Sequence, residues 1–158
     1  MKVNYLNFIS QWQEEKKFLI PIIKKVMSSG QYVGVKAGEI TKFENKVKKM
    51  CGVKHAVALN SGTDALILAM HSMGIKRGDE VITPANSYVA STGAIIHLGA
   101  IPVFADVLPD QNIDPKKIEA AITNKTRAIM PVHLTRRSCS MDEIMKISKR
   151  HNIPVVED

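Results

Sequence analysis

A run of small polar residues, Asn60-Ser61-Gly62-Thr63, separates a short apolar segment from a helical pattern. The apolar segment, residues 55–59, has the length of a strand, and the following pattern predicts a helix. Ser61 or Thr63 can cap the first helical turn, and Gly62 allows another group close to the backbone. The free N–H groups and the helix dipole then favour an anion such as phosphate. The turn alone is equally typical of any α/β domain, because no established phosphate-loop motif accompanies it.

Elements that could position this turn alternate along the chain. Two amphipathic helices are predicted before it, at 10–29 and 39–50, with a loop at 31–34 between them, and Pro21 should kink the first helix or make it begin afresh. After the turn, helices are predicted directly after Gly62, at 86–98 with Asn86 or Ser87 as the cap, after Asp114 as the N-cap with Pro115 at the first helical position, and at 141–150. Strands are predicted at 80–83, 101–105, 126–131 and 153–157. This alternation predicts a single α/β domain with three layers, a mainly parallel sheet with helices on both faces.

In such sheets, ligands bind beyond the carboxyl ends of the strands. We therefore expect residues 60–62, residues 84–88 and Asp158 to lie together at the edge of the sheet where the strands have their carboxyl ends. His133 ends a strand near this edge, and packing or a backbone hydrogen bond explains it better than catalysis. Asp106 and Asp110 lie in a loop, where turn chemistry explains them better than a metal site.

Composition narrows the functional classes. Of the 158 residues, 45% are hydrophobic and 23% are charged, which is typical of an ordered globular protein. The net charge of +7 suggests a nucleic-acid-binding protein. Many lysines, however, fall on solvent-exposed helix faces without interleaved aromatic residues, so we expect no nucleic-acid binding. No apolar run reaches membrane-spanning length and no targeting segment is evident, so a cytoplasmic protein is expected. Cys51 and Cys139 match no metal-ligand spacing and are expected to be reduced.

Taken together, these segments resemble the amino-terminal part of the DegT/DnrJ/StrS-type sugar aminotransferases, which are pyridoxal-phosphate enzymes of the aspartate-aminotransferase fold. The succession of motifs, rather than any single one, carries the resemblance. The matching segments are Ser-Gly-Gln-Tyr-Val-Gly (29–34), Phe-Glu (43–44), Lys-His-Ala-Val-Ala (54–58), Asn-Ser-Gly-Thr-Asp-Ala-Leu (60–66), Gly-Asp-Glu-Val-Ile-Thr-Pro-Ala-Asn-Ser-Tyr-Val-Ala (78–90), Pro-Val-His-Leu (131–134) and Val-Glu-Asp (156–158).

The resemblance implies pyridoxal 5'-phosphate as the cofactor. It also implies that this chain, residues 1–158, is the amino-terminal part of the large, cofactor-binding domain of such an enzyme. Ser61, Gly62 and Thr63 would then hold the cofactor phosphate. Tyr88 matches the position whose aromatic ring stacks on the pyridine ring, although a loop tyrosine with a buried ring and a wet hydroxyl is an alternative. Asp158 matches the carboxylate that pairs with the protonated pyridine nitrogen, although a cap or a strand-end carboxylate is an alternative.

The implied activity is transfer of an amino group, from glutamate, to a nucleotide-linked keto-deoxysugar in polysaccharide or antibiotic-sugar biosynthesis. A homodimer is also implied, since active sites of the family draw residues from two subunits. A sugar dehydratase of the same family, in which histidine replaces the Schiff-base lysine, is one alternative. A non-catalytic cofactor-binding or regulatory protein is another.

The chain departs from the family pattern at two points. Arg136 stands where relatives usually carry glycine, which would strain a backbone that needs a positive φ angle. The lysine that forms the Schiff base lies downstream of Asp158 in the family, and no lysine of this chain matches it. The sequence is therefore interpreted as a fragment without catalytic residues, inactive by itself.

Overall fold

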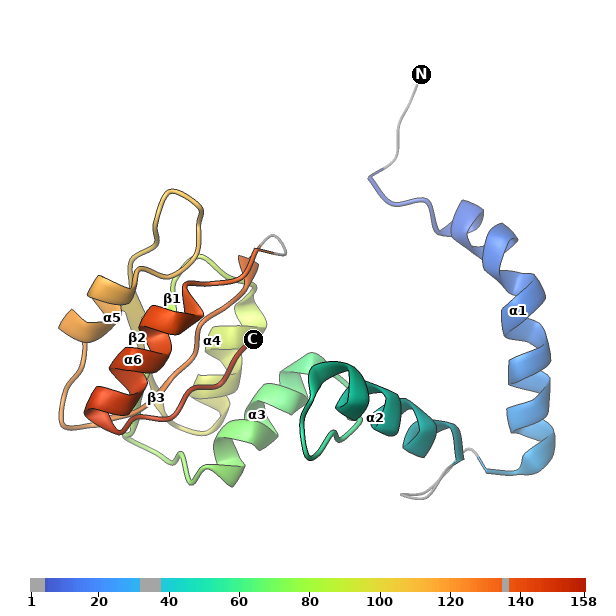
Figure 1. Cartoon of the computed structure of the whole chain (residues 1–158), viewed down its shortest axis with the longest axis horizontal. Helices are drawn as coiled ribbons and strands as arrows, with labels where there is room; N and C mark the ends of the chain where they lie inside the picture. Colours follow the sequence, from blue (N-terminus) through green and yellow to red (C-terminus); the bar gives the residue numbers. More distant parts are fainter. Residues whose placement is uncertain (1–4, 32–37, 135–136) are drawn as a thin grey trace. The chain divides into compact units, whose positions relative to one another are not determined.

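The computed structural model describes residues 5–31, 38–134 and 137–158. The chain divides into two compact units, Met1–Ala58 and Leu59–Asp158. Figure 1 shows the helices of the first unit and the sheet of the second. No helix among the described residues is both long enough and apolar enough to cross a membrane.

The first unit contains two helices that the sequence predicted within a few residues. Helix α1 (Phe8–Ser29) continues through Pro21, so it does not begin afresh there, and it ends at Gly30, whose φ of 67° is left-handed. Helix α2 is Gly38–Cys51. Only Gln31 of the loop predicted at 31–34 is described, and the rest of that loop lies outside the described residues.

The strand predicted at residues 55–59 is wrong, because the structure has no regular secondary structure there. Val57 is 74% exposed, and no described strand pairs with this segment. A strand satisfies its backbone groups only through a neighbour. The Ala58 N–H donates to the Glu44 carboxylate at 3.0 Å and anchors the segment. Apolar composition predicted a strand, but a strand also needs a pairing partner, which the composition does not reveal.

The second unit is organised on a parallel three-stranded sheet. Its strands are β1 (Glu80–Pro84), β2 (Ile101–Ala105) and β3 (Thr126–Ile129), in the order β2-β1-β3. The predicted last strand, 153–157, is reduced to one bridge residue, Val155, which pairs in parallel with Ile129. Backbone hydrogen bonds continue this pairing to the end of the chain, because the Asp158 N–H donates to Pro131 at 3.0 Å.

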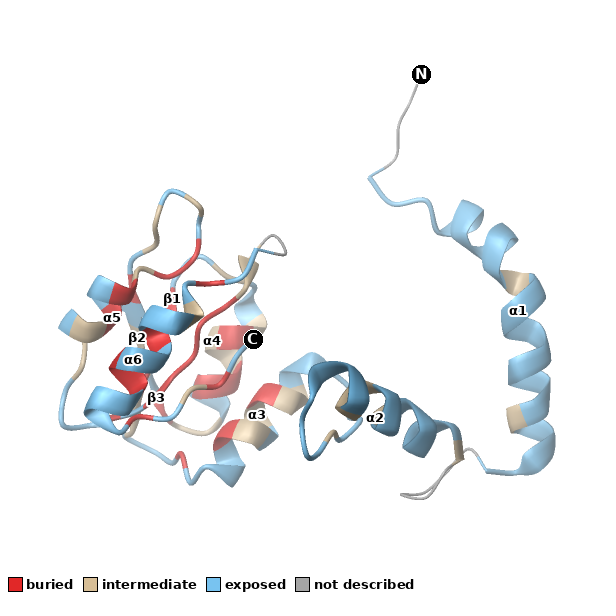
Figure 2. Ribbon diagram, in the orientation of Figure 1, coloured by how far each residue is buried: buried red, intermediate tan, exposed pale blue. Residues whose placement is uncertain are grey.

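Helices cover both faces of this sheet, which confirms the predicted three-layer α/β fold. The helices are α3 (Gly62–Ser72), α4 (Val89–His97), α5 (Pro115–Ala120) and α6 (Met141–His151). Side chains alternate across the strands: Val81 packs in a cluster with α3 and α4, and neighbouring Ile82 packs in a cluster with α5 and α6. Figure 2 shows the buried residues concentrated in this sheet and on the inner sides of its helices.

Local sequence signals explain most helix ends in this unit. The Ser61 hydroxyl accepts from the Asp64 N–H at 3.1 Å, and the Asp114 carboxylate accepts from the Lys116 N–H at 2.9 Å, so both are N-caps as predicted. The predicted start of α4 is wrong, since Tyr88 is its N-cap instead of Asn86 or Ser87 and makes no capping hydrogen bond with its side chain.

Candidate functional site

A cavity of about 410 Å³ lies in the second unit, beyond the carboxyl ends of β1 and β3. Its volume is in the range of small-molecule sites. The lining comes from separate parts of the chain, and the residues that matter chemically are Gly62, Thr63, Tyr88, Ser91, His133 and Asp158. The crossover topology thus brings together side chains that are far apart in sequence.

The start of α3 supplies a cradle for an anion. The Ser61 hydroxyl accepts from the Asp64 N–H, and the Ser61 carbonyl accepts from the Ala65 N–H at 3.1 Å. The N–H groups of Gly62 and Thr63 have no intrahelical partner at a helix start, and both residues line the cavity. A Cβ at Gly62 would meet no atom within 4 Å apart from its chain neighbours and the backbone of its own helix, so open space adjoins it. These observations fit a phosphate group.

Tyr88 is one of the residues that line the cavity. The residue precedes α4 in extended conformation, with φ −68° and ψ 145°, and it is 76% exposed. The alternative of a buried ring with only the hydroxyl in water is therefore wrong. An exposed aromatic face beside a cavity can stack on a planar ligand.

Asp158 is held by three hydrogen bonds, two of them through its backbone. Its N–H donates to the Pro131 carbonyl, and its carbonyl accepts from the His133 N–H, each at 3.0 Å. The Ser91 hydroxyl donates to the carboxylate oxygen Oδ2 at 2.5 Å. The carboxylate itself lies at the cavity wall. It can accept a hydrogen bond from a cationic N–H of a ligand.

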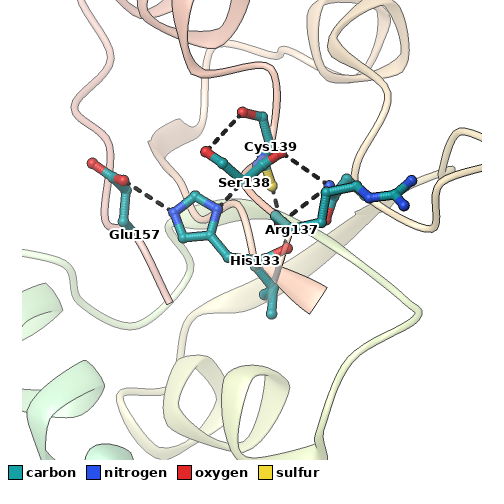
Figure 3. Close-up of polar contacts among 7 residues, drawn as sticks. His133, Arg137, Ser138, Cys139 and Glu157 are labelled. Carbon is teal, nitrogen blue, oxygen red and sulfur yellow. Dashed lines mark hydrogen bonds and ion pairs between the residues drawn. The ribbon is translucent and has the colours of Figure 1, made fainter. Parts of the chain in front are cut away.

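His133 uses both ring nitrogens within the protein. Its Nδ1 accepts from the Cys139 N–H at 3.1 Å, and its Nε2 lies 3.0 Å from Glu157 Oε2, as Figure 3 shows. A backbone N–H only donates, so Nδ1 carries a lone pair and the ring proton sits on Nε2, pointing at Glu157. The predicted backbone hydrogen bond also exists, from the His133 N–H to the Asp158 carbonyl.

A loop behind the cavity carries Cys139. Its buried thiol donates to the Val132 carbonyl at 3.2 Å, and burial raises the pKa of this thiol. The amide of buried Asn112 donates to the carbonyls of Arg137 and Ser138 at 3.3 and 3.2 Å. Arg136, whose effect on the backbone was in question, lies outside the described residues.

Four of the five predicted site residues, Gly62, Thr63, Tyr88 and Asp158, line this one cavity. Ser61 caps α3 and is not part of the lining. Asp106 and Asp110 lie outside the lining, and each bonds a nearby backbone N–H, as expected from turn chemistry. Sequence reasoning missed Ser87 and Ser91. Their spacing of four residues within the predicted helix 86–98 was the signal, because residues four apart on a helix lie on the same side. In the structure Ser87 lies just before α4, and its hydroxyl still reaches Ser91.

The arrangement suits a ligand with three properties. The free N–H groups of α3 match an anionic group, Tyr88 matches a flat ring, and the Asp158 carboxylate matches a protonated ring nitrogen. Pyridoxal phosphate, which the sequence resemblance implied, has all three. The described residues at the cavity therefore fit this cofactor.

Residues 13–158 match the model of the DegT/DnrJ/EryC1/StrS aminotransferase family. GDP-perosamine synthase of Caulobacter vibrioides is 50% identical over 120 residues, which cover 75% of this chain and 32% of that protein. The dTDP-3-amino-3,6-dideoxy-alpha-D-galactopyranose transaminase of Aneurinibacillus thermoaerophilus is 45% identical over 139 residues, covering 86% of this chain and 37% of that protein. The chain thus spans about a third of the length of these relatives.

A solved structure shares the fold at close to full coverage of this chain. It is the crystal structure of NtdA from Bacillus subtilis with bound cofactor PMP, at a TM-score of 0.92 and 32% sequence identity. The similarity covers 99% of this chain and 36% of that chain.

Proposed function

This chain belongs to the DegT/DnrJ/EryC1/StrS aminotransferase family, and from that premise we propose that its cavity binds pyridoxal phosphate in a sugar aminotransferase. The observation that carries the proposal is the shared lining of one cavity by Gly62, Thr63, Tyr88 and Asp158. These residues provide complementary contacts for the two ends of the cofactor, the phosphate and the pyridine nitrogen.

At the phosphate end, the N–H groups of Gly62 and Thr63 bind the anion together with the dipole of α3. The hydroxyl of Thr63 is a further donor at this wall of the cavity. Ser61 acts indirectly, because its side chain fixes the helix start by accepting from Asp64. The two N–H groups that remain are thereby oriented for the phosphate.

At the ring end, Tyr88 stacks on the pyridine and excludes water from one face. Asp158 accepts a hydrogen bond from the ring nitrogen and keeps the proton there. The bound cofactor supplies an electron sink that stabilises negative charge beside the transferred amino group. The contribution of this chain is thus to orient the ring and to maintain its positive charge.

The relatives support a substrate class. One is named for a GDP-linked amino sugar and the other as a transaminase of a dTDP-linked amino sugar. We propose a nucleotide-linked keto-sugar as the acceptor, glutamate as the donor and a homodimer as the active assembly. Amino transfer from glutamate to such a sugar, assayed with the protein as the cell makes it, tests this part. Binding of the cofactor without transfer would instead favour a non-catalytic role, and loss of the sugar hydroxyl would favour a dehydratase.

Cofactor binding is tested on the chain itself by calorimetric titration with pyridoxamine phosphate, which needs no covalent attachment. Asp158→Asn should weaken binding about ten- to a hundredfold, because it removes a hydrogen bond between charged groups. Tyr88→Ala should weaken it about three- to tenfold through lost stacking. Asp106→Asn and Tyr5→Ala are matched controls outside the cavity. A folded wild-type chain that fails to bind, or site variants that bind as the controls do, would contradict the proposal.

Gly62→Ala isolates the phosphate cradle. The new methyl group has room in the protein, so folding should be unaffected, but it should hinder the approach of an anion to the backbone. We therefore expect the substitution to weaken the binding of pyridoxamine phosphate much more than the binding of pyridoxamine, which lacks the phosphate. An equal effect on both ligands would place the phosphate elsewhere.

A further inference from the structure

Three polar side chains form a continuous hydrogen-bonded line at the cavity wall. Ser87 Oγ lies 2.7 Å from Ser91 Oγ, and Ser91 Oγ lies 2.5 Å from Asp158 Oδ2. Ser91 is 1% exposed, so its hydroxyl is withdrawn from bulk water, whereas Ser87 is half-buried and Asp158 is exposed. The line crosses 67 residues of sequence to join the start of α4 to the last residue of the chain.

Proton counting fixes the direction of this line. An ionised carboxylate can only accept, so the single hydroxyl proton of Ser91 goes to Asp158 Oδ2. Ser91 Oγ then has only lone pairs to offer to Ser87, so the Ser87 hydroxyl must donate to it. The order is therefore Ser87 to Ser91 to Asp158, and Oδ1 of Asp158 stays available to a ligand.

The remaining freedom of Asp158 lies in its side chain. Its backbone is tied on both sides, to Pro131 and to His133. The carboxylate is exposed and could otherwise rotate about its two side-chain bonds. The bond from Ser91 restricts this rotation, and Ser91 is itself held in α4, where its N–H donates to the Tyr88 carbonyl at 3.1 Å. Ser91, which fixes the carboxylate, thus belongs to α4, the helix that begins directly after Tyr88.

We propose that Ser91 is a positioning residue that fixes the carboxylate of Asp158 with Oδ1 toward the pyridine nitrogen of the cofactor. The inference rests on the proposed cofactor. Ser87 has the lesser role of orienting the Ser91 hydroxyl. A fixed carboxylate avoids the cost of ordering a mobile side chain on binding. It also keeps an acceptor at the ring nitrogen, which favours the protonated ring.

The first arm of the test uses the free chain and needs no cofactor. NMR couplings of the Asp158 β-protons should report one rotamer in the wild-type chain and rotamer averaging in Ser91→Ala. Ser91→Thr keeps the hydroxyl and should restore one rotamer. Ser148→Ala is the matched control, because Ser148 is also a buried helical serine but lies outside the cavity. Averaging in the wild-type chain would overturn the proposal.

The second arm uses pyridoxamine phosphate labelled at the ring nitrogen. In the wild-type complex, the NMR shift of this nitrogen should be that of the protonated ring. Ser91→Ala should move it toward the unprotonated value and weaken binding about fivefold, the size expected for one hydrogen bond. Ser87→Ala should have a smaller effect in the same direction, and Ser91→Thr should restore both readouts.

The two arms separate the possible failures. One rotamer in the free wild-type chain without any cofactor binding would refute the proposed cofactor, and the positioning role would be refuted with it. Binding with an unchanged nitrogen shift in Ser91→Ala would refute the positioning role alone. Alanine is well accepted in a helix, so Ser91→Ala should fold. Circular dichroism of each variant checks that loss of folding is not the cause of a changed readout.

Discussion

The two units of the chain differ in what their apolar side chains contact. In Leu59–Asp158, two clusters of buried residues fill the spaces between the sheet and its helices. In the first unit, α1 and α2 have no buried residue, and Ile22 and Ile23 of α1 are each 53% exposed. Figure 2 shows the contrast along the chain.

This difference separates two kinds of sequence signal. Helix formation depends on local spacing and caps, and both units carry these signals, such as Gly30 after α1 and Ser61 before α3. Burial depends on a second apolar surface from another part of the chain. An amphipathic pattern therefore predicts that a helix forms, but not what covers its apolar face.

The largest effect is expected in the core of the second unit. Ile129 is fully buried in the cluster with α5 and α6, and it carries the bridge to Val155. Ile129→Ala should lower the free energy of unfolding by about 2–5 kcal/mol, because it removes buried methyl groups and leaves a cavity. Urea unfolding followed by circular dichroism measures the change. A loss below about 1 kcal/mol would show that this core is loosely packed.

A buried polar contact should have the next largest effect. The Asn112 amide donates to the carbonyls of Arg137 and Ser138, and the residue is 1% exposed. Asn112→Ala should lower the free energy of unfolding by about 1–3 kcal/mol, because it removes the buried side-chain amide that donates to both carbonyls. Exposed Asn124→Ala is the control, and urea unfolding of both variants gives the comparison. Equal losses would mean that the contact contributes nothing.

The elements of the second unit could be predicted because their signals are local. Pro84 ends β1 and the Asp114-Pro115 pair starts α5, as the sequence indicated. The segment 55–59 could not be assigned in the same way, because its pairing depends on residues far away in sequence. The same reason limits the last strand, where only Val155 forms a bridge.

The candidate site could be predicted only in part, for a related reason. The anion cradle at Gly62 and Thr63 follows from a local turn, whereas the roles of Tyr88 and Asp158 came from the resemblance. Ser87 was interpreted as a possible helix cap. In the structure its hydroxyl lies against Ser91, four residues away, and only the direction of that hydrogen bond depends on Asp158, which accepts the Ser91 proton. A hydroxyl has one proton, and its partner is decided by tertiary structure.

The two cysteines provide a chemical comparison of the units. Cys51 is exposed in the first unit and Cys139 is buried in the second. We expect iodoacetamide to alkylate Cys139 on the order of a hundredfold more slowly, which corresponds to a local opening of about 3 kcal/mol. Mass spectrometry of timed samples measures both rates. Similar rates would show that the loop carrying Cys139 opens freely.

The same thiol should make stability depend on pH. Burial raises the pKa of Cys139 in the folded state above the unfolded value. The stabilisation that the protonated thiol gives the folded state is therefore complete below the pKa of the thiol in the unfolded chain, about 8.5. It is lost as the pH rises through the pKa of the thiol in the folded chain. The difference in unfolding free energy between wild type and Cys139→Ala should shrink over that range. A difference independent of pH would contradict this.

The smallest effect is expected for Ile22→Ala, which repeats the change at Ile129 on the exposed surface of α1. The variant loses the part of the isoleucine that is covered, but alanine is a better helix former by a few tenths of a kcal/mol, so the net change should stay within about 0.5 kcal/mol. Trp12, the single tryptophan, lies in α1 and reports on it by fluorescence. An unchanged emission and urea midpoint would confirm that the apolar face of α1 is uncovered in the isolated chain. A loss as large as that of Ile129→Ala would show the opposite, and dependence of that loss on protein concentration would identify a second copy of the chain as the cover.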